Sequence, residues 1–158
     1  MEKVEVGKEV PNFSLTATSA LSFELNQLRG KKIVLYFYPK DNTPGCTQES
    51  IDFRDLYSEF LKNNTVIFGI SRDNLTSHEK FKSSQQFPFE LLADVNSAVC
   101  DLFDVIKPKV MYGQQTKGIE RSTFLIDEQG VLCHEWRKVK VPGHAQEVLT
   151  YLHTEKKP

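Results

Sequence analysis

The sequence predicts an α/β fold in which a central mixed β-sheet is flanked by helices on both faces. Short apolar runs alternate with amphipathic segments along the chain, and no internal repeat or long linker interrupts them. The run at 33–38 is apolar without alternation, as in a central strand covered on both faces. With 158 residues, 39% of them hydrophobic, the chain suits a single domain over residues 1–158.

The first half of the chain contains the clearest elements. Residues 13–15 and 22–25 indicate a short N-terminal β-hairpin around the small polar stretch 16–20, and the buried strand 33–38 follows it. From Thr47 onward apolar residues recur at a spacing of three to four, which predicts an amphipathic helix ending at Asn63-Asn64. The apolar positions of this helix are Phe53, Leu56, Tyr57, Phe60 and Leu61.

The second half continues the alternation of strands and helices. Apolar runs predict strands at 65–70, 89–92 and 122–126, and the turn at 128–130 leads into a further strand at 131–136. Helices are expected at 74–87, which ends before Pro88, at 97–103, and near the C-terminus around Ala145, Val148, Leu149 and Leu152. The prolines, glycines and polar residues of 107–118 predict a loop, with Met111 and Tyr112 as candidate apolar contacts for a substrate.

Charge and hydropathy exclude several classes of protein. The net charge of −1 gives no bulk attraction for nucleic acid or an anionic membrane. Charged residues throughout 1–10 are unlike the apolar core of a signal peptide, and no run approaches the roughly 20 apolar residues that span a bilayer. A cytoplasmic protein is therefore expected, without nucleic-acid or membrane partners.

The chain has three cysteines, Cys46, Cys100 and Cys133, which are widely spaced and form no C-x-x-C motif. A structural disulfide framework is not expected in such a chain. The four histidines are scattered, and no Cys or His pair has metal-ligand spacing. Neither a metal nor another cofactor is therefore expected.

Cys46 is the strongest candidate for chemistry. A buried strand ends before it, Pro39, Pro44 and Gly45 shape a tight loop, and a helix is expected to begin at the cysteine. The unpaired N–H groups and positive dipole end of a helix start stabilise a thiolate, which is the nucleophilic form of cysteine. The small or turn-forming neighbours predict that no bulky core side chain covers this sulfur. The alternative is that Cys46 is a small buried hydrophobe, as free cysteines often are.

The segment Pro39-x-x-x-Thr43-x-x-Cys46 resembles the active-site signature of the peroxiredoxins. The longer string YFYPKDNTPGCT at 36–47 is similar to the bacterioferritin comigratory protein, or peroxiredoxin Q, branch of that family. The similarity continues in order along the chain, with GIS at 69–71, LLAD at 91–94, RSTFLID at 121–127 and WRKVKV at 136–141. Several blocks in the same order make the resemblance far more specific than one short motif.

The resemblance implies a thioredoxin-like fold and a thiol-dependent peroxidase that reduces hydrogen peroxide and organic hydroperoxides. By analogy with the family, Cys46 attacks the terminal peroxide oxygen and becomes a sulfenic acid. The Thr43 hydroxyl bonds the thiolate and the peroxide, Pro39 shields the sulfur, and Arg121 completes the site. Charge that develops on the leaving oxygen is stabilised by fixed donors, which act more on the transition state than on the ground state.

Other residues near Cys46 are expected to bind substrate or support the site. Pro44 and the backbone N–H of Gly45 are candidate contacts for the peroxide. Glu49 lies one helical turn after Cys46 and has two open interpretations, stabilisation of the helix dipole or orientation of Arg121. Lys40 and Asp41 are expected to be solvated loop charges.

The usual resolving thiol of the branch is missing from this chain. Where relatives carry it, this sequence has Ile51, or Ser83 and Ser84 in the following helix. Cys100 is expected to be buried and inert, and Cys133 to be structural. A one-cysteine peroxidase is therefore predicted, monomeric and regenerated by thioredoxin, glutaredoxin or glutathione. Two rivals are a redox sensor that uses Cys46 oxidation as a switch, and a thioredoxin-type disulfide reductase, which normally needs a C-x-x-C pair.

Overall fold

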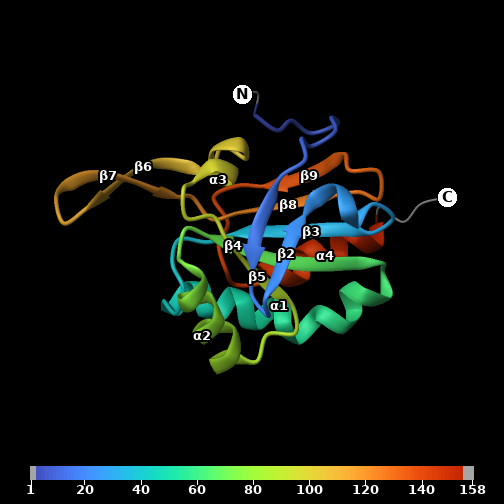
Figure 1. The fold of residues 1–158 in the computed structure, drawn as a ribbon, viewed down its shortest axis with the longest axis horizontal. Coiled ribbons are helices and arrows are strands. Elements are labelled where there is room, and N and C mark those ends of the chain that lie inside the picture. Colours follow the sequence, from blue (N-terminus) through green and yellow to red (C-terminus); the bar gives the residue numbers. More distant parts are fainter. Residues whose placement is uncertain (1–2, 155–158) are drawn as a thin grey trace.

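A computed structural model describes residues 3–154 of the chain, apart from the side chain of Met111. Seven strands form one mixed sheet in the order β2-β1-β5-β4-β3-β8-β9 (Figure 1). Their bounds are β1 Ser14–Ala17, β2 Leu21–Glu24, β3 Lys32–Phe37, β4 Thr65–Ser71, β5 Glu90–Ala93, β8 Ser122–Ile126 and β9 Leu132–Trp136. The three central strands β3, β4 and β5 are parallel, and the pairs on either side are antiparallel, which confirms the expected mixed sheet.

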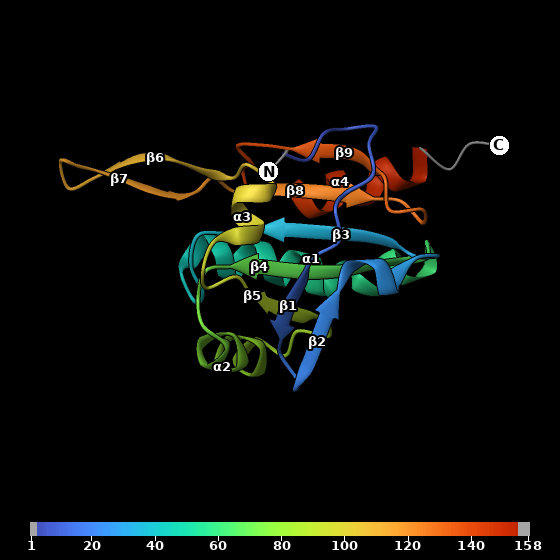
Figure 2. The ribbon, with the colours of Figure 1, turned by 45° about the horizontal axis from the view of Figure 1, so that its top comes forward.

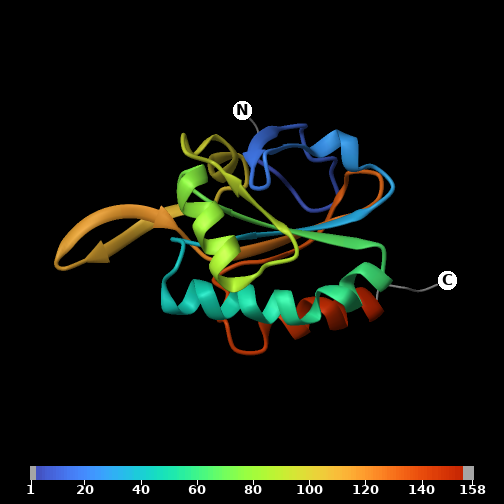
Figure 3. The same cartoon turned by 60° about the horizontal axis from the view of Figure 1, so that its bottom comes forward.

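Helices cover both faces of this sheet. Helices α1 (Pro44–Lys62) and α4 (His144–Thr154) lie side by side on one face (Figure 3) and share its core with Phe81 of α2 (Leu75–Gln85). Helix α3 (Ala98–Leu102) and the 3₁₀ helix η1 (Leu25–Leu28) contribute to the core on the opposite face. Within residues 3–154, no helix has the length and apolarity to cross a membrane.

The centre of the sheet determines where the site lies. Five of the six residues of β3 are buried, which explains the continuous apolar run there. Phe37, at the carboxyl end of β3, pairs with Ser122, at the start of the antiparallel strand β8. Helix α1 also begins at this edge, so the residues just before Ser122 meet its first turn.

The segment 107–118, expected to be a loop, is instead a β-hairpin. Strands β6 (Ile106–Met111) and β7 (Gln114–Ile119) form a separate two-stranded ribbon that projects from the body (Figure 2). Tyr112 and Gly113 both have positive φ, 53° and 78°, which suits the tight turn that closes a twisted hairpin. Much of the hairpin faces solvent, so its residues do not alternate between apolar and polar, and the pattern that predicts a strand is absent there. Tyr112 is 99% exposed at the tip, and the side chain of Met111 lies outside the described part of the chain.

Candidate active site

Cys46 lies in the first turn of α1. This helix begins at Pro44, three residues before the expected start at Thr47, because proline is favoured at a first helical position. The Thr47 N–H donates to the Thr43 carbonyl over 2.8 Å. The N–H groups of Gly45 and Cys46 precede this bond, so they lack partners within the helix. They are therefore donors at the positive end of a 19-residue helix.

The Cys46 side chain is buried, with 1% of its surface exposed. The expectation that no core side chain covers the sulfur is wrong, because the first turn of α1 packs onto the core between the sheet and the helices. The neighbouring Pro44 and Gly45 remain exposed, and Pro39 is half-buried. The sulfur is thus buried, although neighbouring residues of the loop and of the first helical turn are exposed.

Arg121 links the sulfur to a buried carboxylate. Its Nη2 donates to Cys46 Sγ over 3.4 Å, and its Nη1 donates to Glu49 Oε1 over 2.7 Å. Burial alone would lower the pKa of Arg121, but the Glu49 carboxylate and the Cys46 sulfur raise it above its ordinary value. The guanidinium is therefore a cation held beside the sulfur.

Glu49 is completely buried, and it lies beyond the first turn of α1. Burial raises its pKa to about 7, although the Arg121 charge and hydrogen bond oppose this increase. Among residues 3–154, its Oε2 finds no hydrogen-bond partner. Of the two interpretations left open by the sequence, this geometry favours orientation of Arg121 over stabilisation of the helix dipole.

Thr43 and Gly45 are close to Cys46 in sequence, and Gly45 also lies near Arg121. The Thr43 hydroxyl donates its one hydrogen to the Lys40 carbonyl over 2.9 Å, so it does not make the bond to the Cys46 sulfur that the resemblance implied, and its lone pairs remain able to accept. A Cβ on Gly45 would lie 3.3 Å from Arg121 Nη2. Glycine therefore leaves the space that the guanidinium needs to reach the sulfur.

Asp41 is not a solvated loop charge, although Lys40 beside it is exposed. Only 6% of Asp41 is exposed, and its carboxylate bonds the side chains of Tyr38, Ser77 and His78. This burial of Asp41 could not be predicted from the sequence, because Ser77 and His78 lie more than 35 positions away on α2. His78 is the residue near the site that sequence reasoning missed.

Asp41, Asp73 and His78 bring three potential metal-ligand atoms within 4.8 Å of one another. These groups already bond protein atoms. His78 Nδ1 lies 2.7 Å from Asp41 Oδ2, and Asp73 Oδ2 accepts from the Asp41 N–H and the Ser71 hydroxyl. The cluster is thus a hydrogen-bond network, and a metal ion would have to displace its hydrogens.

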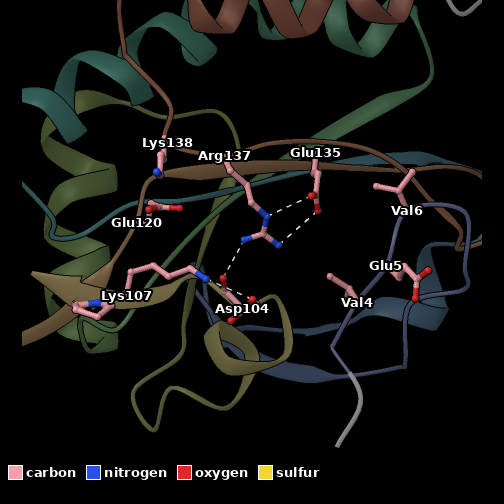
Figure 4. Close-up of a pocket in the computed structure, with 10 residues that line it drawn as sticks. Val4, Glu5, Val6, Asp104, Lys107, Glu120, Glu135, Arg137 and Lys138 are labelled. Carbon is pink, nitrogen blue, oxygen red and sulfur yellow. Dashed lines mark hydrogen bonds and ion pairs between the residues drawn. The ribbon is translucent and has the colours of Figure 1, made fainter.

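A cavity of about 810 Å³ has no contact with Cys46 among its lining residues, most of which Figure 4 labels. It is lined by residues of the N-terminal segment together with Arg137, Lys138 and Lys107, and none of the candidate catalytic residues is among them. Arg137 donates to the carbonyls of Phe103 and Asp104 and to Glu135, so its donors are already engaged. The volume of a cavity therefore does not identify the active site of this protein.

The other two cysteines lie elsewhere. Cys100 is completely buried on the opposite face of the sheet from Cys46, where burial and then the Asp94 carboxylate raise the pKa of its thiol. Cys133 is half-buried on β9, and its Sγ donates to the Leu125 carbonyl over 3.3 Å.

Comparison with known proteins supports the resemblance seen in the sequence. Residues 6–135 match the AhpC/TSA family. The chain is 47% identical to Peroxiredoxin Bcp of Bacillus subtilis over 149 residues, which cover 94% of this chain and 95% of the relative. A cysteine-to-serine variant of peroxiredoxin Q from Xylella fastidiosa has a TM-score of 0.93 at 40% identity, covering 99% of this chain and all of that one.

A further solved structure is that of the bacterioferritin comigratory protein of Xanthomonas campestris, described in connection with its alkyl peroxide reduction activity. It has a TM-score of 0.90 at 44% identity, and the match covers 97% of this chain and all of that one. These neighbours also confirm the thioredoxin-like fold. The chain accordingly belongs to the AhpC/TSA family, in its peroxiredoxin Q (Bcp) branch, and is a thiol-dependent peroxidase.

Proposed function

We propose that Cys46 is the peroxide-reducing thiol and that it passes through a sulfenic acid. The observation that carries this proposal is the bridge formed by Arg121, which donates to Cys46 Sγ and is held by buried Glu49. A guanidinium fixed in this way favours a thiolate as its acceptor.

The reaction assigns a role to each neighbour of the sulfur. The thiolate attacks the terminal oxygen of the hydroperoxide, the O–O bond breaks, and the remaining oxygen leaves as water or an alcohol after taking up a proton. Arg121 and the N–H groups of Gly45 and Cys46 stabilise the charge on the leaving oxygen. The Thr43 hydroxyl, whose hydrogen is engaged with Lys40, accepts from the peroxide O–H. Pro39 and Pro44 restrict access to small substrates.

The substrates we propose are hydrogen peroxide and alkyl hydroperoxides. The Xanthomonas campestris relative is described in connection with alkyl peroxide reduction, and it matches this chain over 97% of its length. Tyr112 is 99% exposed at the turn of the β6–β7 hairpin, and we assign it no substrate contact.

We further propose that the enzyme is of the one-cysteine type. Cys100 lies on the far side of the sheet. Cys133 lies on β9 beside Leu125 and Ile126, at the end of β8, whereas the Arg121 that donates to Cys46 Sγ immediately precedes the first residue of β8. A disulfide needs Cα atoms within roughly 7 Å of each other, and this placement at opposite ends of β8 disfavours one. An external thiol then condenses with the sulfenic acid, which forms a mixed disulfide with Cys46 and releases water. A second thiol attacks this disulfide and regenerates the Cys46 thiol.

The proposal is tested by steady-state peroxide consumption in four proteins: the wild type, Cys46→Ser, Cys100→Ser and the Cys100→Ser/Cys133→Ser double variant. Turnover should be lost only in Cys46→Ser. Mass spectrometry after one equivalent of peroxide should find a sulfenic acid or a mixed disulfide on Cys46. An intramolecular disulfide would refute the one-cysteine mechanism, and a single round of oxidation without turnover would favour the sensor.

The reductant is tested in the same assay. Thioredoxin, glutathione with glutaredoxin, and dithiothreitol are compared at matched thiol concentration. We expect at least one physiological thiol to sustain turnover in the double variant. Turnover with dithiothreitol alone would mean that neither proposed physiological donor is the partner.

A further inference from the structure

We infer that Asp41 and His78 form a buried polar latch that positions the catalytic loop, residues 39–46, for peroxide reduction. This inference rests on the proposed role of Cys46. Asp41 lies in the middle of that loop, two residues after Pro39 and two before Thr43. Its side chain is buried, while Lys40 and Asn42 on either side are exposed. The loop is therefore anchored through Asp41.

Four hydrogen bonds fix Asp41 to elements outside the loop or at its base. Its Oδ1 accepts from the Tyr38 hydroxyl over 2.6 Å, and its Oδ2 accepts from the Ser77 hydroxyl over 2.8 Å and faces His78 Nδ1 at 2.7 Å. Its backbone N–H donates to Asp73 Oδ2 over 2.8 Å. Ser77 and His78 belong to the first turn of α2, where the positive end of the helix dipole also favours a carboxylate.

His78 closes the latch from the other side. It is completely buried, and its Nε2 lies 2.9 Å from the Leu92 carbonyl oxygen on β5. A carbonyl oxygen only accepts, so Nε2 must carry a hydrogen, and a hydrogen must also lie between Nδ1 and the Asp41 carboxylate. Both ring nitrogens are thus committed, and His78 connects the catalytic loop to the central sheet.

The latch restricts a segment that would otherwise be free to move. Residues 40–43 have no helix or strand structure, and Asn42 has a φ of 61°, a backbone conformation that needs support from its surroundings. Thr43 and Cys46 follow directly, so any shift at Asp41 moves the sulfur relative to Arg121. Misplacement of about 1 Å at a reacting centre costs up to about 100-fold in rate. Asp41 and His78 act through Cys46 and Thr43, and they are positioning residues.

The test compares variants that remove the latch with one that preserves its shape. Asp41→Ala and His78→Phe each remove the Asp41–His78 bond. Asp41→Asn keeps an acceptor oxygen for Tyr38, and its two amide N–H groups can donate to Ser77 Oγ and to Nδ1 of a neutral His78. Stopped-flow oxidation of Cys46 by hydrogen peroxide should slow about tenfold in the first two and remain within about threefold of wild type in Asp41→Asn. The Asp41→Ala/His78→Phe double variant should be no slower than either single variant, because the two residues act as one unit.

Two controls separate positioning from loss of stability. Asp94 is another fully buried carboxylate, but it accepts from the N–H groups of Val99 and Cys100 in α3. Asp94→Asn should lower the melting temperature without slowing peroxide reduction. Alkylation of Cys46 by iodoacetamide needs an accessible sulfur but no aligned donors, so its rate should hold or rise in the latch variants while the peroxide rate falls.

Either of two results would overturn the latch: folded latch variants whose peroxide rate lies within about twofold of wild type, or single-variant losses that multiply in the double variant. If Asp41→Ala or His78→Phe does not fold, His78→Gln takes its place, and an unchanged peroxide rate there counts against the latch equally. Peroxidase activity persisting in Cys46→Ser would instead refute the proposed role of Cys46.

Discussion

Replacement of Glu49 by glutamine tests whether the buried carboxyl beside Arg121 titrates near neutral pH. Glu49 is completely buried, and its pKa rises from the ordinary 4.5 to about 7, with burial as the main cause. The folded protein therefore binds this proton more tightly than the unfolded chain does. The resulting contribution to stability is complete below pH about 4.5 and is lost as the pH rises through about 7.

The magnitude follows from the gap between the two pKa values. A gap from 4.5 to about 7 corresponds to a loss of about 3 kcal/mol between acid and mildly alkaline pH. Glutamine has the shape of the protonated carboxyl and does not titrate, so Glu49→Gln avoids this loss. Relative to wild type, the variant should gain about 3 kcal/mol in its free energy of unfolding from pH 4.5 to pH 8.

Urea denaturation of the wild type and of Glu49→Gln at several pH values between 4.5 and 8 measures this difference in the free energy of unfolding. Other titrating groups are the same in the two proteins, so their contributions cancel in the difference. Glu59→Gln is the matched control, since Glu59 lies on the same helix in a surface ion pair with Lys62. Its difference from wild type should stay within about 1 kcal/mol throughout. A Glu49→Gln difference that does not change with pH would refute the reasoning, because burial would then not favour the neutral carboxyl.

Three other substitutions test the site and the core around it. Arg121→Ala should slow peroxide reduction beyond what a parallel thiolate titration of Cys46 explains, since the guanidinium also acts on the leaving oxygen; a loss fully explained by ionisation would contradict this. Gly45→Ala should raise the melting temperature, because alanine favours the helix by up to about 1 kcal/mol, yet slow stopped-flow peroxide reduction, because its Cβ would lie 3.3 Å from Arg121 Nη2. An unchanged rate would show that the guanidinium has room to move. Gly69→Ala should cost about 1–3 kcal/mol by urea denaturation, because its Cβ would lie 2.8 Å from the Tyr36 ring; a smaller loss would mean that this ring yields.

The helices and most strands were predictable because their signals are local. The apolar run of β3 and the helical spacing in α1 are patterns within a single segment, so they can be recognised before it is known which other elements cover them. The β6–β7 hairpin was missed for the same reason. Its strands pair only with each other, and the exposed positions from Gln114 to Lys117 carry no apolar pattern.

The proposed nucleophile and its cation were predicted from the sequence, whereas the sequence left the role of Glu49 open and missed the burial of Asp41. Cys46 and Arg121 belong to recognisable blocks, whereas the burial of Glu49 and its bond to Arg121 depend on how α1 packs against β8. Asp41 was taken for a solvated charge because its neighbours in the loop are exposed. Its partner His78 lies 37 positions away, where no local pattern records the contact.

The amino-acid sequence by itself determined most of the order of elements and the family, and it singled out Cys46 as the candidate nucleophile, since these depend on local periodicity and on contiguous motifs. Only the tertiary structure decided that the sulfur is buried, that Glu49 holds Arg121 and that His78 anchors the catalytic loop. Each of these facts is a contact between segments distant in the chain. Such contacts depend on how the strands are ordered and how the helices pack on them, which the spacing of residues along one segment does not encode.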